Sequence, residues 1–216
     1  MDIYFISGLG ADKRIFQKLI LPENFTVHYI EWLHVYGKES LQNYCRRLSE
    51  QIDQSRQFIL IGVSFGGIVA VQLSRLLKPV QTIIISSFCF KKEVSKFYIF
   101  LGKTSLFKLL PSRFLLKSNN FLFRLFGAVN AEEKKLLTDI LSDTDPEFFN
   151  WALNKLFAWD NSWRPKSFLH IHGTADRILP YRANMNAIPV EGGQHLMVFS
   201  RADEISRLLA KNLLNL

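Results

Sequence analysis

The sequence predicts an α/β fold with a mostly parallel six-stranded sheet flanked by helices. Short apolar, β-branched runs alternate with helical patterns along most of the chain, as expected when crossover helices connect parallel strands. One long helical segment, without convincing strands, interrupts this alternation. With 216 residues, of which 48% are apolar or aromatic, the chain can bury a sizeable core.

Six runs are expected to form the strands, because each is short, rich in Val, Ile or Phe, and bounded by turn residues. The expected strands are Ile3–Ser7, Thr26–Ile30, Phe58–Gly62, Gln81–Ser86, Ser167–His172 and Ala187–Val190.

Helices are expected between these strands and after the last strand, where apolar residues recur at helical spacing. Pro79 marks the end of the third, since proline cannot continue a helix. The expected helices are Lys13–Ile20, Glu39–Asp53, Phe65–Leu77 and Ala202–Leu214.

The segment from 88 to 165 is predicted to be an inserted helical cap, which leaves 1–87 and 166–216 as the core domain. Nine of the 19 phenylalanines lie in its first half, and four of them recur every seven residues. That spacing favours the inner face of a packed cap over a ligand site. The four are Phe100, Phe107, Phe114 and Phe121.

The net charge of +8 is concentrated in one region, because residues 88–130 hold eight basic residues and one acidic residue. A solvated helix face is the simplest interpretation, and an amphipathic surface that contacts anionic membrane is the next. No nucleic-acid-binding motif accompanies the charge, so a nucleic-acid partner is not expected. The membrane hypothesis assigns Lys103, Lys108 and Lys117 to the contact.

The sequence predicts neither a signal peptide nor a cysteine-based motif. The start MDIYFISGLG is expected to be a buried strand, because it lacks the basic region and cleavage site of a signal peptide. No apolar run is long enough to span a bilayer, and Cys45 and Cys89 form neither a disulfide framework nor a zinc motif. A cytoplasmic setting is expected, with peripheral contact at the inner membrane surface under the membrane hypothesis.

Ser64 is the candidate nucleophile. It lies in Gly62-Val63-Ser64-Phe65-Gly66, directly between an expected strand and an expected helix. A serine on such a turn projects its Oγ from the carboxyl edge of the sheet, and small residues two positions before and after it allow the turn to close. The amino end of the following helix favours negative charge at the same point.

A serine nucleophile needs a base and a carboxylate that orients the base. Among the five histidines, His195 lies in the loop between the last strand and the last helix, whereas His28 and His170 lie inside strands and His34 in an early loop. His172 forms an H-x-H pair with His170, but no nearby carboxylate–histidine cluster supports a metal site there.

Asp176 is the candidate orienting carboxylate because it follows the fifth expected strand in HGTADRILP. The competitors Asp160, Asp143 and Asp145 belong to the polar half of the expected cap, where solvated charges are ordinary. An oxyanion hole would combine the backbone amides of Phe65 and of Leu9, the latter in the glycine-containing loop after the first strand. That loop lacks the lysine and serine of a nucleotide-binding P-loop.

These features together resemble the α/β-hydrolase superfamily. Ser64, Asp176 and His195 follow the family's Ser–Asp–His order, and the HG-x-x-D context of Asp176 also matches. The resemblance implies a helical cap after the fourth of the six strands and a catalytic triad without a cofactor or metal. One departure is Ser7-Gly8, where members of the family frequently have His-Gly.

Serine at this turn favours hydrolysis of an ester, thioester or amide through an acyl-enzyme. The Phe- and Leu-rich segment 88–130 favours a hydrophobic acyl substrate, which makes a carboxylic ester hydrolase or a thioesterase the leading prediction. Two alternatives remain open: a non-catalytic binding module that keeps the fold, and a membrane-surface interaction protein that uses the basic cap.

Overall fold

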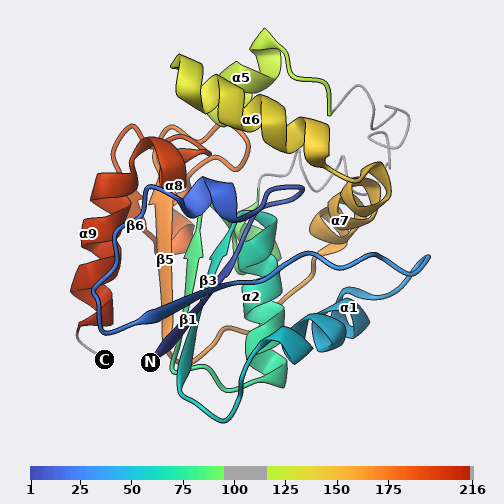
Figure 1. Ribbon diagram of the computed structural model, residues 1–216, viewed down its shortest axis with the longest axis vertical. Helices are drawn as coiled ribbons and strands as arrows, with labels where there is room; N and C mark the ends of the chain where they lie inside the picture. Colours follow the sequence, from blue (N-terminus) through green and yellow to red (C-terminus); the bar gives the residue numbers. More distant parts are fainter. Residues whose placement is uncertain (95–115, 215–216) are drawn as a thin grey trace.

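The computed structural model describes residues 1–94 and 116–214 (Figure 1). All six strands pair in parallel in one sheet, in the order β2-β1-β3-β4-β5-β6. The predicted fold class is therefore confirmed. The strands are β1 (Asp2–Ile6), β2 (Thr26–Tyr29), β3 (Phe58–Val63), β4 (Gln81–Ile85), β5 (Phe168–Gly173) and β6 (Ile188–Val190).

The strand order reverses direction at β1. The chain passes from β1 outward to β2 and then returns to place β3 on the other side of β1, with Ile6 opposite Gly62. The loops that leave β1 and β3 therefore diverge at the carboxyl edge of the sheet. Parallel α/β sheets bind ligands at such a switch point. In this chain the switch point places the loop after Ser7 beside Ser64.

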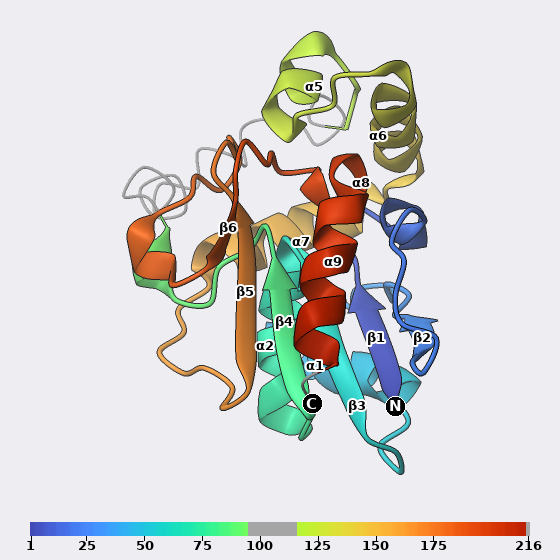
Figure 2. The ribbon, with the colours of Figure 1, turned by 90° about the vertical axis from the view of Figure 1, so that its left-hand side faces the viewer.

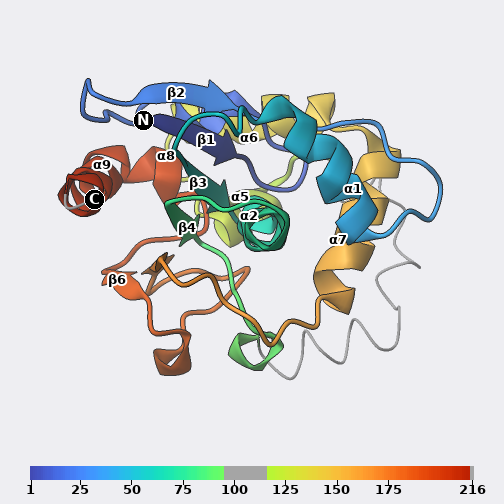
Figure 3. The same cartoon turned by 90° about the horizontal axis from the view of Figure 1, so that it is seen from below.

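Helices cover both faces of the sheet. Figure 3 shows α8 and α9 on one side and α1, α2 and α7 on the other. The helices of the described residues are α1 (Leu41–Leu48), α2 (Phe65–Leu76), α5 (Asn120–Phe126), α6 (Ala131–Asp143), α7 (Pro146–Ala158), α8 (Met197–Ser200) and α9 (Ala202–Leu213). Short 3₁₀ turns are η1 (Lys13–Phe16), η2 (Ser49–Gln51), η3 (Lys91–Glu93) and η5 (Ala183–Met185).

The central strand β3 is buried along its whole length, and its side chains alternate between two apolar clusters. Phe58 and Leu60 pack in the cluster that contains α1, α2 and α7, whereas Ile59 and Ile61 pack in the cluster that contains α9. Burial on both faces explains why β3 reads as an uninterrupted apolar run.

Among the described residues between β4 and β5, three α-helices follow one another: α5, α6 and α7. In Figure 2, α5 and α6 lie at the end of the molecule toward which the strand arrows point. The described part of 88–165 contains helices and no strand, and the helical cap domain stays a prediction. Among the described residues, no helix has the length and apolar character needed to cross a membrane.

Two sequence-based expectations need correction. Phe121 does not lie on an inner face: its side chain is 70% exposed, and Leu122 is buried instead. The helix begins at Asn119, whose side chain accepts from the Leu122 amide, and this start sets which residues face inward. Phe100, Phe107 and Phe114 lie outside the described residues.

The helix expected over Lys13–Ile20 is only the 3₁₀ turn η1. Asp12 accepts from the Arg14 amide and binds the Arg14 guanidinium, and Ile15 and Phe16 are already buried. Ile20 is exposed, so no apolar face continues that could stabilise a longer helix.

Candidate active site

Ser64 lies on a strained turn between β3 and α2. Its backbone has φ 54° and ψ −120°, a combination that costs energy for any residue with a side chain. Hydrogen bonds hold the turn on both sides: the Ser64 amide donates to the Ile85 carbonyl, and the Ser64 carbonyl accepts from the Gly67 amide and the Ser87 hydroxyl. The surrounding structure therefore fixes the direction of the Ser64 side chain.

The glycines on either side of Ser64 are required by close backbone packing. A Cβ on Gly66 would lie 2.2 Å from the Ser7 carbonyl oxygen, and a Cβ on Gly62 would lie 2.2 Å from the Gly66 oxygen. These distances are far inside van der Waals contact. The turn after β3 thus packs backbone to backbone against the end of β1.

The three residues predicted as a catalytic triad are brought together. His195 Nε2 is 2.9 Å from Ser64 Oγ, and His195 Nδ1 is 2.8 Å from Asp176 Oδ2. Because an ionised carboxylate only accepts, Nδ1–H of His195 donates to Asp176, and Nε2 is left to accept from the Ser64 hydroxyl. Asp176 and His195 are both buried.

Asp176 is held in its ionised form. Burial alone opposes ionisation, but the interactions with His195 and His172 and the hydrogen bond from the Leu179 amide together outweigh it, and the pKa of Asp176 lies below its ordinary value. Its second oxygen, Oδ1, accepts from the backbone amides of Ile178 and Leu179, each at 2.8 Å. The carboxylate is thereby fixed by three donors.

The His195 loop is anchored from two directions. The Gly193 carbonyl accepts from the Ala175 amide, and the Leu196 amide donates to the Phe126 carbonyl at the end of α5. The Phe126 ring also meets the His195 imidazole edge-on at 5.6 Å. Sequence reasoning missed Phe126, because its contact with His195 joins segments about 70 residues apart.

The loop after β1 is closed by contacts that the sequence did not reveal. Ser7 Oγ donates to the Ala11 carbonyl at 2.6 Å, so the residue that departs from the family's frequent histidine still fixes the loop. Trp32 Nε1 also donates to the Ala11 carbonyl, and Thr144 Oγ1 donates to the Gly10 carbonyl.

The loop that contains Leu9 lies beside the turn that contains Phe65. A Cβ on Gly8 would lie 3.4 Å from Ser64 Cβ, so the Leu9 loop adjoins the Ser64 turn. Among the described residues, no backbone carbonyl accepts from either amide. Phe65 is the first residue of α2, where amides have no partner within the helix. Both can serve as donors to a substrate oxygen.

The competing residues have other partners. Asp143 pairs with Arg14, Asp160 pairs with Lys91, and Asp145 caps α7. In the part of the chain that the structure describes, no group of three or more histidine, cysteine or acidic side chains could hold a metal ion. Both cysteines are free and buried.

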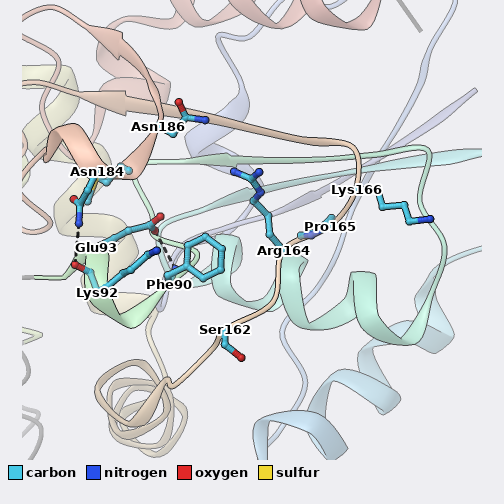
Figure 4. Close-up of a pocket in the computed structure, with 10 residues that line it drawn as sticks. Phe90, Lys92, Glu93, Ser162, Arg164, Pro165, Lys166, Asn184 and Asn186 are labelled. Atoms are coloured by element: carbon cyan, nitrogen blue, oxygen red, sulfur yellow. Dashed lines mark hydrogen bonds between the residues drawn. The ribbon is translucent and has the colours of Figure 1, made fainter.

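A cavity of about 560 Å³ lies elsewhere, where η3, the segment before β5 and η5 meet (Figure 4). Its charged lining consists of Lys92, Arg164, Lys166 and Glu93, and the Glu93 carboxylate already accepts from the Cys89 and Phe90 amides. Ser64, Asp176 and His195 do not line it. The triad, not this cavity, is therefore the candidate active site.

Comparisons with known proteins agree with the fold. The model of the alpha/beta hydrolase family matches residues 3–208. Compared with curated proteins by sequence, the chain has no match.

Solved structures share the fold at low sequence identity. An esterase from Thermogutta terrifontis is 14% identical with a TM-score of 0.74, covering 100% of this chain and 90% of its own. A hydrolase from Oleispira antarctica is 16% identical with a TM-score of 0.72, covering 100% and 91%. An enol-lactonase from Burkholderia xenovorans LB400 is 17% identical with a TM-score of 0.68, covering 98% and 90%.

Gly66→Ala is expected to destabilise the fold, because the new Cβ overlaps the Ser7 and Ile6 carbonyl oxygens. A clash of this kind typically costs about 1–3 kcal/mol or more. Urea denaturation measures the change, with Gly8→Ala as the control, since a Cβ there meets only ordinary contacts. Equal stability of the two variants would contradict the packing described for this turn.

Stability is expected to fall as the pH is lowered from about 7. Burial, reinforced by the neighbouring His172 imidazole, lowers the pKa of His170 to about 3, and burial also lowers the pKa of His172. Unfolded histidines titrate near ~6.5. The unfolded chain therefore binds protons that the folded chain does not, so stability is complete above ~6.5 and is lost toward the folded pKa values.

Each of the two histidines can contribute up to about 1.4 kcal/mol per pH unit in that window. Urea denaturation at pH 7, 6 and 5 measures the slope, which His170→Gln should reduce. His34→Gln is the matched control, because His34 is exposed. A slope that is the same in parent and His170→Gln would show that His170 is not held neutral.

Proposed function

The chain belongs to the alpha/beta hydrolase family, and on that premise we propose that it is a serine hydrolase that cleaves an ester or thioester of a hydrophobic acyl compound. The observation that carries the proposal is the continuous hydrogen-bonded series from Ser64 Oγ through His195 to Asp176. Serine becomes nucleophilic at neutral pH when a base oriented in this way accepts its proton.

In the proposed mechanism, Ser64 Oγ attacks the acyl carbonyl carbon while His195 Nε2 accepts the hydroxyl proton. Asp176 remains ionised and stabilises the imidazolium that forms. The Leu9 and Phe65 amides donate to the oxyanion, aided by the amino end of α2. His195 then protonates the leaving alkoxide or thiolate, and the acyl group stays on Ser64.

The second half of the reaction reverses these roles. His195 accepts a proton from water, the hydroxide attacks the acyl-enzyme carbonyl, and Ser64 leaves with the proton from His195. No step needs a cofactor, since proton transfer and charge stabilisation come from side chains and backbone of this chain.

Aromatic residues near the nucleophile support a hydrophobic acyl group as the substrate. Phe65, the residue after Ser64, packs against Trp32 and Trp151, and Trp32 packs against Phe148 of α7. On the other side, Phe126 lies against His195. In this proposal the segment 88–165 is a cap whose helices contribute the apolar walls for the acyl chain.

Replacing Ser64 by alanine is expected to abolish labelling by a fluorophosphonate probe and to lower kcat/KM on p-nitrophenyl esters by about 10⁴-fold or more. His195→Ala should also block labelling. The control is Ser55→Ala, an exposed serine in the loop before β3. Labelling that persists in Ser64→Ala, or a parent chain that is never labelled, would favour a non-catalytic binding module.

Esters and thioesters of graded chain length test the substrate class. The apolar surroundings of Ser64 predict that kcat/KM rises as methylenes are added to the acyl group, because each buried methylene contributes about 0.8 kcal/mol of binding. A preference for short or charged acyl groups would contradict a hydrophobic acyl site.

We also propose that α5 contacts an anionic lipid surface. Phe121 and Val129 are 70% and 69% exposed, and the basic side chains of Lys117 and Arg124 beside them are exposed as well. Apolar residues flanked by cations are typical of interfacial segments. The same helix ends at Phe126 against His195, so docking would bring the lipid surface close to the triad. Lys103 and Lys108 lie outside the described residues.

Lys117→Glu together with Arg124→Glu is expected to weaken binding to vesicles that contain phosphatidylglycerol, and salt should weaken binding of the parent. Lys78→Glu is the matched control, because Lys78 follows α2 at the opposite end of the sheet. Vesicle co-sedimentation measures the binding. Equal partition of the parent to neutral and anionic vesicles at low salt would contradict the proposal.

A further inference from the structure

Two buried histidines lie directly behind the proposed triad. His170 and His172 alternate along β5 and so share one face of the sheet, and their rings meet with His170 Nε2 3.1 Å from His172 Nδ1. Both side chains are buried, His172 completely. Neither is needed for the mechanism above, and neither takes part in a metal site among the described residues.

The hydrogen-bond partners fix which ring nitrogen carries each proton. His172 Nε2 is 2.7 Å from the Leu179 carbonyl oxygen, which can only accept. A neutral His172 therefore carries its proton on Nε2 and accepts at Nδ1 from His170 Nε2–H. In this arrangement His170 Nδ1 is left without a proton, because the proton of the neutral ring is on Nε2.

Leu179 connects this pair to the triad. Its carbonyl accepts from His172, and its amide donates to Asp176 Oδ1. His172 Nε2 also lies 3.6 Å from Asp176 Oδ2, the oxygen that accepts from His195. His172 therefore contacts both the turn that holds the carboxylate and the carboxylate itself.

We propose that His172 is a positioning residue for Asp176: its Nε2–H holds the Leu179 carbonyl, and through the turn 176–179, whose amides bind Oδ1, it fixes the carboxylate whose Oδ2 orients His195. His170 in turn fixes the tautomer and ring orientation of His172. This inference rests on the proposed hydrolase function, because it concerns how well Asp176 orients the base.

The geometry explains why two histidines are buried at this place. A leucine of similar volume could fill the space, but it would leave the Leu179 carbonyl without a donor, and buried carbonyls without partners are unfavourable. A purely structural role predicts a loss of stability with unchanged turnover per folded molecule. A positioning role predicts a loss in kcat at unchanged KM, because substrate contacts are not altered.

Three variants separate these roles. His172→Leu removes the donor, His172→Gln keeps an N–H where Nε2 lies, and Ile171→Val is a buried control on the opposite face of β5. We expect kcat on a p-nitrophenyl ester to fall at least tenfold in His172→Leu with KM within twofold of the parent. His172→Gln should stay within about threefold in kcat, and Ile171→Val should match the parent.

Turnover in folded His172→Leu within twofold of the parent would overturn the proposal, as would a His172→Gln that loses as much kcat as His172→Leu. If a fluorophosphonate does not label the parent, the proposed function itself fails. Failure of the His172 predictions in a parent that is labelled overturns this inference alone. Circular dichroism and a thermal melt establish that each variant is folded.

The unmodified protein provides a test that does not depend on the folding of a variant. ¹⁵N spectra of histidine-labelled parent chain report which ring nitrogens are protonated. The proposal predicts neutral His170 and His172 at pH 7, each with its proton on Nε2. A proton on Nδ1 of His172 would overturn it, because Nε2 could then not donate to Leu179.

Discussion

The close backbone contact between the turn at Ser64 and the end of β1 is the constraint on which the rest of the site depends. Ser64 can keep its unfavourable backbone conformation only because Gly62 and Gly66 allow this approach. The same contact places the loop that contains Leu9 beside Ser64, because both segments leave the sheet where the strand order reverses. This one packing arrangement therefore positions both the nucleophile and the proposed oxyanion donors.

The charge states of the site residues follow from their burial and from the hydrogen bonds that Asp176 accepts. Asp176 keeps its charge because His195 and the amides of Ile178 and Leu179 together donate to it. Behind it, burial keeps His170 and His172 uncharged, which leaves His172 a neutral donor. A carboxylate held in this way can orient the base without being protonated itself.

The strands of the sheet, the place of Ser64 and the contact between Asp176 and His195 could be predicted from the sequence. Each of them depends on local patterns and on the carboxyl ends of parallel strands. The sequence was not sufficient for contacts between distant segments, such as Thr144 with the Gly10 carbonyl or Phe126 with His195. The exposure of Phe121 was missed because the spacing of phenylalanines does not tell where a short helix begins. His172 was considered only as a metal ligand, since its partner Leu179 is a backbone carbonyl without a sequence signature.

The central claim is that Ser64 becomes covalently acylated during turnover. The most direct measurement is the mass of the intact chain after acid quenching in the steady state with a slowly hydrolysed p-nitrophenyl ester, followed by peptide mapping. We expect a mass increase of one acyl group on the peptide that contains Ser64, and none in Ser64→Ala. Turnover without an acylated Ser64, or with the acyl group on another residue, would contradict the claim.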